Sequence, residues 1–196
     1  APRTADGSTS FSSVTNAVTG RRLNQGLEGL ALTPDNKKLV TLLQSATMQD
    51  SNTANQETRT NTRLMIYDIA NNATPTAPTA HYVLQLPVFT SNGNGGVVNR
   101  TAAQSELLAL NDNQFLVLAR DGNGLGQANL NPVYKSILLV DTTGATNIAG
   151  TAFETTTTPI SPNGVLNSSI KPVSQVEVVN MLNTTQLDRF GLNINN

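Results

Sequence analysis

The chain has 196 residues, which is long enough for one domain with its own hydrophobic core. Its formal net charge is −1 and only 13% of its residues are charged, so charge gives no basis for binding nucleic acid or an anionic membrane surface. No apolar run approaches the ~20 residues of a membrane-spanning helix. The chain contains no cysteine, which excludes disulfides and thiolate metal sites within it.

Short apolar runs recur along the chain between turns rich in Gly, Pro, Asn and Asp, and this pattern is typical of an all-β protein. One helical turn is expected within Val179–Phe190. Long polar connections, which we expect to be easily cut by proteases, cover residues 45–62, 91–101, 121–132 and 142–163. The expected strands, in chain order, are Leu27–Leu32, Lys38–Gln44, Arg63–Ile69, His81–Leu86, Glu106–Leu110, Phe115–Arg120, Ser136–Asp141 and Val173–Val179.

A unit of roughly 75 residues is repeated. It opens with Glu-Gly-Leu-Ala-Leu at residues 28–32 and with Glu-Leu-Leu-Ala-Leu at residues 106–110. In each copy a polar turn, an apolar strand, a long loop and a third strand follow, and the third strands end at Asp68 and Asp141. The repeat predicts two four-stranded antiparallel meanders, which are the building units of a β-propeller.

A propeller closes with roughly four to eight blades, so two blades predict only part of one. We expect residues 1–22 to end a preceding blade, residues 23–101 and 102–182 to form two blades, and residues 183–196 to begin the next. The whole propeller is expected to have roughly six or seven blades, the others supplied by a companion chain or fragment. The chain would then be a proteolytic fragment. The alternative is a β-sandwich of roughly seven or eight strands.

The segment Asn24–Asp35, with the order Asn-Gln-Gly-Leu-Glu-Gly-Leu-Ala, resembles the central signature of the phytase-like (esterase-like activity of phytase) family, with Leu27 in place of the usual aromatic residue. The segments 63–68 and 106–121 resemble two further family segments, although Ala119 stands where Glu is common. The resemblance implies a propeller. It also implies a secreted, extracellular protein, because members are mostly secreted by bacteria and fungi. The asparagine-rich composition favours a fungal member.

Glu28 and Glu106 occupy matching positions on the first strands of the two predicted blades, which line the channel of a propeller. Two carboxylates that face one channel repel each other unless a cation or a proton lies between them. Oxygen-rich surroundings without sulfur suit Ca²⁺, so a calcium site at these residues is one prediction. In the alternative, each Glu bonds backbone amides or pairs with an arginine such as Arg63 or Arg120.

Two functions follow from this arrangement. The first is a hydrolase, a metal-dependent phosphoesterase or esterase with its site at the channel mouth. Glu28 would then bind the metal, Glu106 would be a ligand or base, and Arg63 or Arg120 would hold the anion. The second is a non-catalytic extracellular propeller that binds a protein or a glycan through its loops. His81, the only histidine, is expected to be exposed or at a sheet edge.

Four Asn-x-Ser/Thr sequons predict a glycoprotein. Their asparagines are Asn72, Asn99, Asn167 and Asn183.

Overall fold

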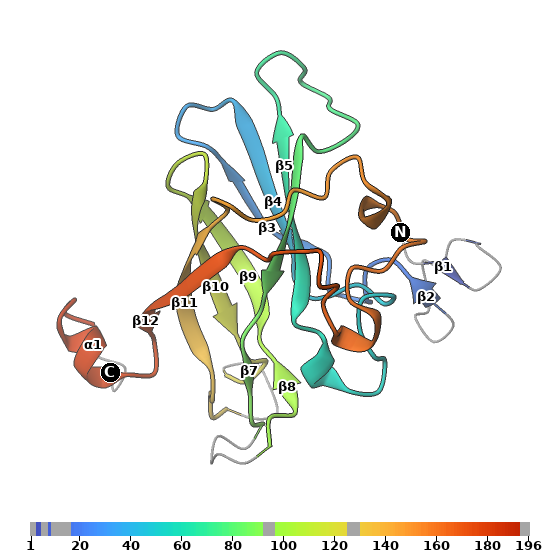
Figure 1. Ribbon diagram of the computed structural model, residues 1–196. Helices are drawn as coiled ribbons and strands as arrows, with labels where there is room; N and C mark the ends of the chain where they lie inside the picture. The colour runs from blue at the N-terminus through green and yellow to red at the C-terminus, as the bar shows by residue number, and fades with distance from the viewer. Residues whose placement is uncertain (1–2, 5–7, 9–16, 92–96, 125–129, 193–196) are drawn as a thin grey trace.

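The computed structural model describes residues 3–4, 8, 17–91, 97–124 and 130–192 (Figure 1). In this part of the chain, eight strands form two antiparallel sheets of four strands each. The first sheet contains β3 (Leu27–Leu32), β4 (Lys38–Leu43), β5 (Asn61–Asp68) and β6 (Ala80–Gln85). The second contains β9 (Ala103–Ala109), β10 (Gln114–Arg120), β11 (Lys135–Asp141) and β12 (Ser174–Asn180).

Each sheet is a simple meander, because its strands pair in the order in which they follow one another along the chain. Local polar side chains fix the tight turns. In the turn between β3 and β4, the Thr33 hydroxyl accepts a hydrogen bond from the Lys38 backbone amide at 3.1 Å, and Asn36 adopts a left-handed backbone conformation with φ of 59°. The predicted all-β class and the two four-stranded meanders are therefore confirmed.

Shorter elements complete the described structure. The sequence did not predict the two-residue and three-residue strands, but it predicted a helical turn within Val179–Phe190, which is confirmed by α1 (Thr184–Asp188). The Asn183 side chain caps α1 by accepting a hydrogen bond from the Gln186 amide at 3.1 Å. These elements are β1 (Arg3–Thr4), β2 (Ala17–Thr19), β7 (Val88–Phe89), β8 (Arg100–Thr101), the 3₁₀ turns Gln56–Thr58, Ala152–Glu154 and Pro162–Gly164, and α1 (Thr184–Asp188).

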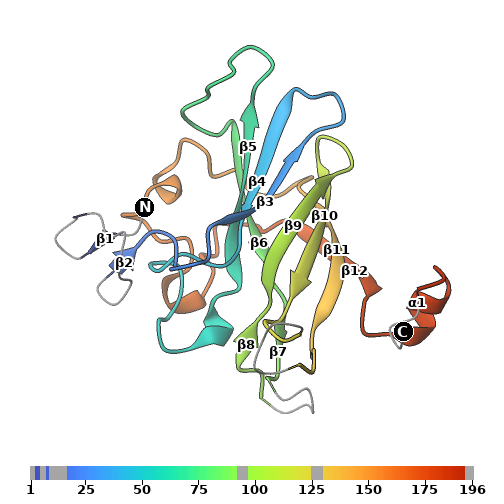
Figure 2. The same ribbon diagram turned by 180° about the vertical axis from the view of Figure 1, so that it is seen from behind.

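The first strands of the two sheets, β3 and β9, lie side by side (Figure 2). Gly29 permits this approach, because a Cβ atom at this position would lie only 2.9 Å from Cβ of Leu107. One hydrophobic core fills the space between the two sheets. Its buried members are Val40, Leu42, Leu64, Ile66, Leu84, Leu86, Ala102, Leu107, Ala109, Phe115, Val117, Ala119, Leu138, Val140 and Val173.

The face of the second sheet that points away from this core is also apolar. A row across all four strands consists of Leu108, Leu116, Leu139 and Val176, which are neighbours in register. Leu108 is 56% exposed. On the first sheet, Leu30 is 59% exposed on the corresponding outward side of β3. Soluble proteins seldom leave contiguous apolar rows open to water.

Residues 142–173, which connect β11 to β12 and which we call the strap, run along the outer edge of the first sheet. The Ile148 amide bonds the His81 carbonyl at 2.8 Å, and the Val173 amide bonds the Val83 carbonyl at 2.9 Å. A second small core packs Val83 against isoleucines of the strap, Ile148 among them. The strap therefore covers strand β6, whose edge would otherwise expose unpaired backbone groups. No helix in the described part of the chain is long and apolar enough to cross a membrane.

Candidate functional site: an arginine-lined basin

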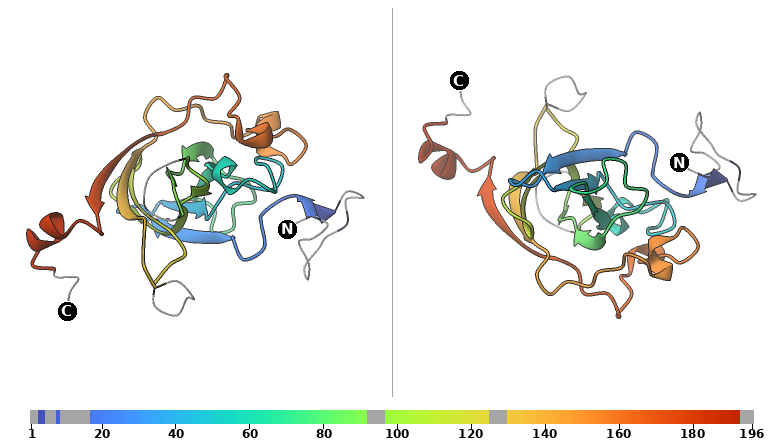
Figure 3. Two further views of the ribbon diagram at one scale, coloured as in Figure 1. Left: turned by 90° about the horizontal axis from the view of Figure 1, so that it is seen from below. Right: turned by 90° about the horizontal axis from the view of Figure 1, so that it is seen from above.

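Three loops meet at the lower end of the sheets in Figure 1, where β3 and β9 begin. In an antiparallel meander, alternate connections return to the same end, so residues 44–60, 86–91, 97–102, 121–124 and 130–134 converge there. Figure 3 (left) looks along the strands from this end. A basin of about 520 Å³ lies among these loops. It is lined by Leu23, Asn24, Gln25, Gln44, Gln56, Phe89, Ser91, Arg100, Thr101, Ala103, Arg120, Asp121, Gly122 and Asn123.

Two half-buried arginines supply the positive charge of the basin. Arg120 ends β10, and its Nε donates to Ser105 Oγ at 2.9 Å. Arg100 lies on β8, and its Nη1 donates to the Asn99 carbonyl at 2.9 Å. The ion pairs found among the described residues involve other side chains. A guanidinium has five N–H donors, so both arginines have donors left for a ligand.

The acidic residue of the basin, Asp121, does not neutralise these arginines. Its Oδ1 accepts a hydrogen bond from Lys135 Nζ at 2.8 Å. Burial raises the pKa of Asp121, but the bond from Lys135 and three backbone amide donors outweigh burial and hold this pKa below its ordinary value. The amides belong to Asn123, Val133 and Tyr134. Asp121 thus stays ionised, and its hydrogen bonds hold Asn123 close to Val133 and Tyr134.

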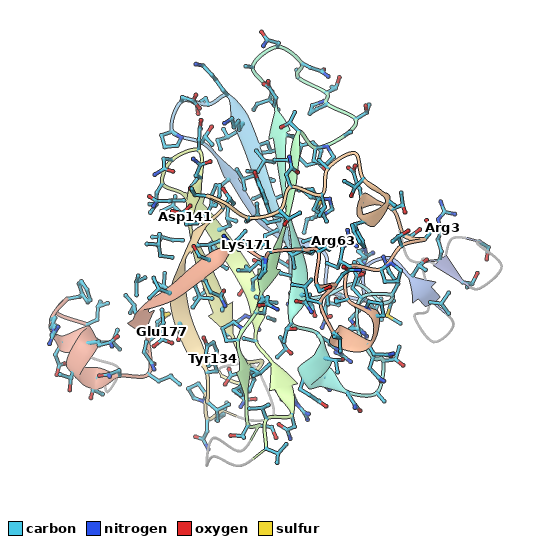
Figure 4. All side chains as sticks on the ribbon, viewed as in Figure 1. Arg3, Arg63, Tyr134, Asp141, Lys171 and Glu177 are labelled. Carbon is cyan, nitrogen blue, oxygen red and sulfur yellow. The ribbon has the colours of Figure 1, made fainter. Side chains whose placement is uncertain are left out.

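One basin-lining residue, Phe89, belongs to an aromatic pair. Phe89 of β7 stacks on Tyr134, with ring centroids 5.6 Å apart and an interplanar angle of 14°. Tyr134 is labelled near the lower end of the sheets in Figure 4. The basin therefore combines cationic donors with an apolar wall and several carboxamides. Such a lining suits a polar ligand that carries both an anionic and an apolar part.

Glu28 and Glu106 are both exposed, and each bonds a nearby backbone amide. Glu28 Oε1 accepts from the Gly26 amide at 3.1 Å, and Glu106 Oε1 accepts from the Leu107 amide at 2.9 Å. This is one of the two arrangements that the sequence left open. Leu107 faces the shared core, so Glu106 lies on the opposite, outward face of its sheet and is not directed at Glu28.

These two carboxylates do not by themselves fit a calcium ion. Ca²⁺ takes six to eight oxygen ligands. In the described part of the chain, no group of three or more His, Cys, Asp or Glu side chains is placed to hold a metal. Calcium at Glu28 or Glu106 therefore stays a prediction, and most of its ligands would have to come from elsewhere in the protein.

Arg63 lies away from the basin and is paired within the protein (Figure 4). Its Nε donates to Asp50 Oδ2 at 3.0 Å, and its Nη1 donates to the Phe153 carbonyl at 2.9 Å. Asp50 is fully buried and also accepts from the Ile160 amide at 2.8 Å. This ion pair ties the strap to the first sheet, so of the two predicted anion-binding arginines only Arg120 lines the basin.

His81 lies beside this ion pair under the strap. The sequence placed it at a sheet edge or exposed; β6 is an edge strand of its sheet, but the strap leaves the side chain only 2% exposed. Its Nε2 lies 3.5 Å from Arg63 Nη1. Burial lowers the pKa of His81 to about 3, and the positive charge of Arg63 acts in the same direction. His81 is therefore neutral at physiological pH and is remote from the basin.

The four sequon asparagines are all exposed on loops or at the start of α1. Asn99 donates to Ser91 Oγ at 3.1 Å, and Asn183 caps α1. Glycosylation at Asn72, Asn99, Asn167 and Asn183 stays a prediction.

Sequence reasoning missed Arg59 and Arg100, which lie in separate long loops. Neither belongs to a motif, and the only available signal was a cationic residue in each of two loops that return to the same end of the meanders.

The chain is thus an all-β protein with two meander sheets and an arginine-lined basin at their loop end. The family model described as Phytase-like, "Esterase-like activity of phytase", matches residues 4–194, so the chain belongs to the phytase-like family. It is 32% identical over 179 residues to an "Uncharacterized secreted protein" of Arthroderma benhamiae. This match covers 89% of the chain but 34% of that relative, so the chain spans about a third of the relative's length. No solved structure matches the chain.

Proposed function

We propose that this protein is a secreted phytase-like β-propeller that binds, and as an ester hydrolase cleaves, an anionic ester in the basin. The observation that carries the proposal is the pair Arg100 and Arg120, which face one hollow without a carboxylate partner in the described structure. Guanidinium groups bind phosphoryl and carboxylate oxygens through charged hydrogen bonds. Phosphoric esters, and carboxylic esters that carry a further anionic group, are therefore the substrate classes that this site favours.

In this proposal the two sheets are neighbouring blades, and further blades cover their outward faces. Support comes from the apolar row Leu108, Leu116, Leu139 and Val176, and from exposed Leu30 on the other side. Burying a leucine side chain contributes about 1.5–3 kcal/mol, so such faces favour a packed neighbour. The relative is about three times as long as the matched region, which leaves room for these blades in one protein or in a companion chain.

Secretion is part of the same proposal. Its support is the relative, which is described as a secreted protein, together with the four sequons of the chain. A companion segment of the same protein is the partner that we propose.

The test compares hydrolysis of p-nitrophenyl phosphate and p-nitrophenyl acetate by the intact secreted protein and by Arg120→Gln and Arg100→Gln. We expect each substitution to lower kcat/KM for the anionic phosphate ester about tenfold or more, because a charged hydrogen bond is worth about 1.5–3 kcal/mol. The acetate ester is uncharged, so its hydrolysis should fall less. Arg189→Gln, at an exposed position after α1, is the control. Unchanged turnover in both basin variants would contradict the proposed site.

The same assay tests the metal prediction. Hydrolysis lost after EDTA treatment and restored by CaCl₂, together with reduced calcium binding in Glu28→Gln or Glu106→Gln, would support it. Anion binding that depends on Arg120 but comes without turnover would instead identify a non-catalytic extracellular propeller.

A further inference from the structure

A second hollow of about 390 Å³ adjoins the basin and shares Leu23 and Gln25 with it. Two arginines, Arg22 and Arg59, line this hollow. Its other lining residues are Ala17, Met48 and Thr53, so it contains no acidic side chain.

Arg22 is buried, with 8% of its surface exposed, yet its hydrogen-bond partners are neutral. Its Nη2 donates to Ser51 Oγ at 2.6 Å and to the Asn52 carbonyl at 3.5 Å. Its Nε is buried without a hydrogen-bond partner. Burial lowers the pKa of Arg22 to about 10, and the charge of Arg59 adds to this effect. A buried cation without a counter-ion is costly.

Arg59 interacts through its charge with two other arginines. Its Nη2 reaches the Thr53 carbonyl at 3.4 Å, while its Nε is buried without a partner. Burial lowers the pKa of Arg59, and the neighbouring charge of Arg100 lowers it further. Arg22, Arg59 and Arg100 thus form a series in which each charge acts on the next. The ion pairs of the described residues leave all three without a carboxylate.

We propose that the hollow at Arg22 and Arg59 is a second oxyanion site, so that the ligand of this protein carries two anionic groups. One group occupies the hollow, which is lined by both arginines and in which each Nε lacks a hydrogen-bond partner. The other occupies the basin at Arg100 and Arg120, and this half of the inference rests on the proposed function. Both hollows are lined by Gln25, so one ligand can span them. The shared chemistry is an oxyanion, either two groups of one ligand or two separate ions.

The test is calorimetric titration of the intact protein with inorganic phosphate and with pyrophosphate. We expect the wild-type protein to bind pyrophosphate about tenfold or more tightly than phosphate, because a second charged contact adds at least one factor of ten. Arg59→Gln should remove most of this preference while leaving phosphate binding in place. Arg120→Gln should weaken the binding of both anions. Arg189→Gln is the control with unchanged binding.

The outcomes separate the two proposals. If Arg59→Gln binds both anions as the wild type does while Arg120→Gln does not, the second site is wrong and the basin stands. If only Arg59→Gln weakens binding, the hollow binds an anion and the basin proposal is wrong. Two phosphate ions bound per protein without a preference for pyrophosphate contradict a single ligand with two groups. A wild-type protein that binds neither anion contradicts both proposals.

A stability measurement distinguishes anion binding by Arg59 from a purely structural role. Without added anion, Arg59→Gln should be at least as stable as the wild type, because it relieves repulsion from Arg22 and Arg100. It should also gain less stability than the wild type on addition of pyrophosphate, by linkage. A variant that is destabilised without anion and gains as much from pyrophosphate as the wild type would overturn the inference.

Discussion

The buried charges of Asp50 and Arg22 are compensated to different extents in this protein. Asp50 bonds Arg63 and the Ile160 amide, so its carboxylate is compensated on both oxygens. Arg22 has neutral partners and one unpartnered nitrogen. The first arrangement is typical of a structural ion pair, and the second favours a ligand.

Because His81 is neutral in the folded protein, the free energy of unfolding depends on pH. Its pKa is about 3 in the folded protein and ordinarily 6.5, so the unfolded chain binds more protons between these values. Stability is therefore fully present above about pH 6.5 and falls as the pH drops toward 3, by at most about 1.4 kcal/mol per pH unit.

We expect His81→Gln to reduce this slope. The measurement is urea unfolding of both proteins between pH 7 and pH 4. Other groups such as Asp121 titrate in both proteins, so the difference between the two curves isolates His81. Parallel curves would contradict a buried, uncharged histidine at this position.

At this scale the sequence could predict types of residue but not their partners. Arg63, the third residue of β5, and Arg120, the last residue of β10, were equally plausible as anion-binding residues. The difference between them is tertiary. Asp50, in a loop 13 residues before Arg63, folds back onto it, while Arg120 meets Ser105 and the open basin. Pairing across loops leaves no periodic signal in a single sequence.

At the scale of elements, the close approach of β3 and β9 depends on Gly29. A Cβ atom there would meet Leu107 Cβ at 2.9 Å and Gln104 Oε1 at 3.0 Å. We expect Gly29→Ala to lower the free energy of unfolding by about 1–3 kcal/mol through overpacking. Gly122→Ala is the matched control, because nothing lies within 4 Å of a Cβ at that position, and it should change stability by less than about 0.5 kcal/mol. Urea unfolding measures both, and equal stabilities would show that β3 can shift at no cost.

The strands were predicted within one to three residues at their ends, because alternating apolar residues and polar turns are local signals. The direction in which the side chains of the two repeat copies face was not predicted. In blades related by rotation about a propeller axis, residues at equivalent positions face the same way around that axis. Gly29 and Leu107, which the sequence repeat places at equivalent positions, instead face each other. The turn between β3 and β4 closes with a hydrogen bond from the Thr33 amide to the Lys38 carbonyl, and the turn between β9 and β10 with one from the Leu110 amide to the Gln114 carbonyl. This difference shifts the alternation of inward-facing and outward-facing side chains by one residue relative to the sequence repeat. Matching Glu28 with Glu106 by sequence therefore did not place them on one surface.

At the scale of the whole molecule, the outward apolar faces distinguish a propeller from a protein of two sheets alone. If a further blade covers the second sheet, Leu108→Asn should destabilise the intact protein by about 2 kcal/mol or more, because a buried leucine is lost. Val165→Asn, on the exposed side of the strap, is the control and should change stability by less than about 0.5 kcal/mol. Thermal and urea unfolding of the intact protein measure both. Equal effects would show that the face of Leu108 is open to solvent and would remove the main support for neighbouring blades.

The strap also affects the order in which the strands of this structure unfold. It belongs by sequence to the connection between β11 and β12, yet its hydrogen bonds are made to β6 and its isoleucines pack on Val83. Strand β6 cannot leave its sheet until the strap is released, and releasing the strap frees the chain that leads into β12. We therefore expect the outer strands of the two sheets to open in one cooperative event, which would give their backbone amides matching rates of hydrogen exchange.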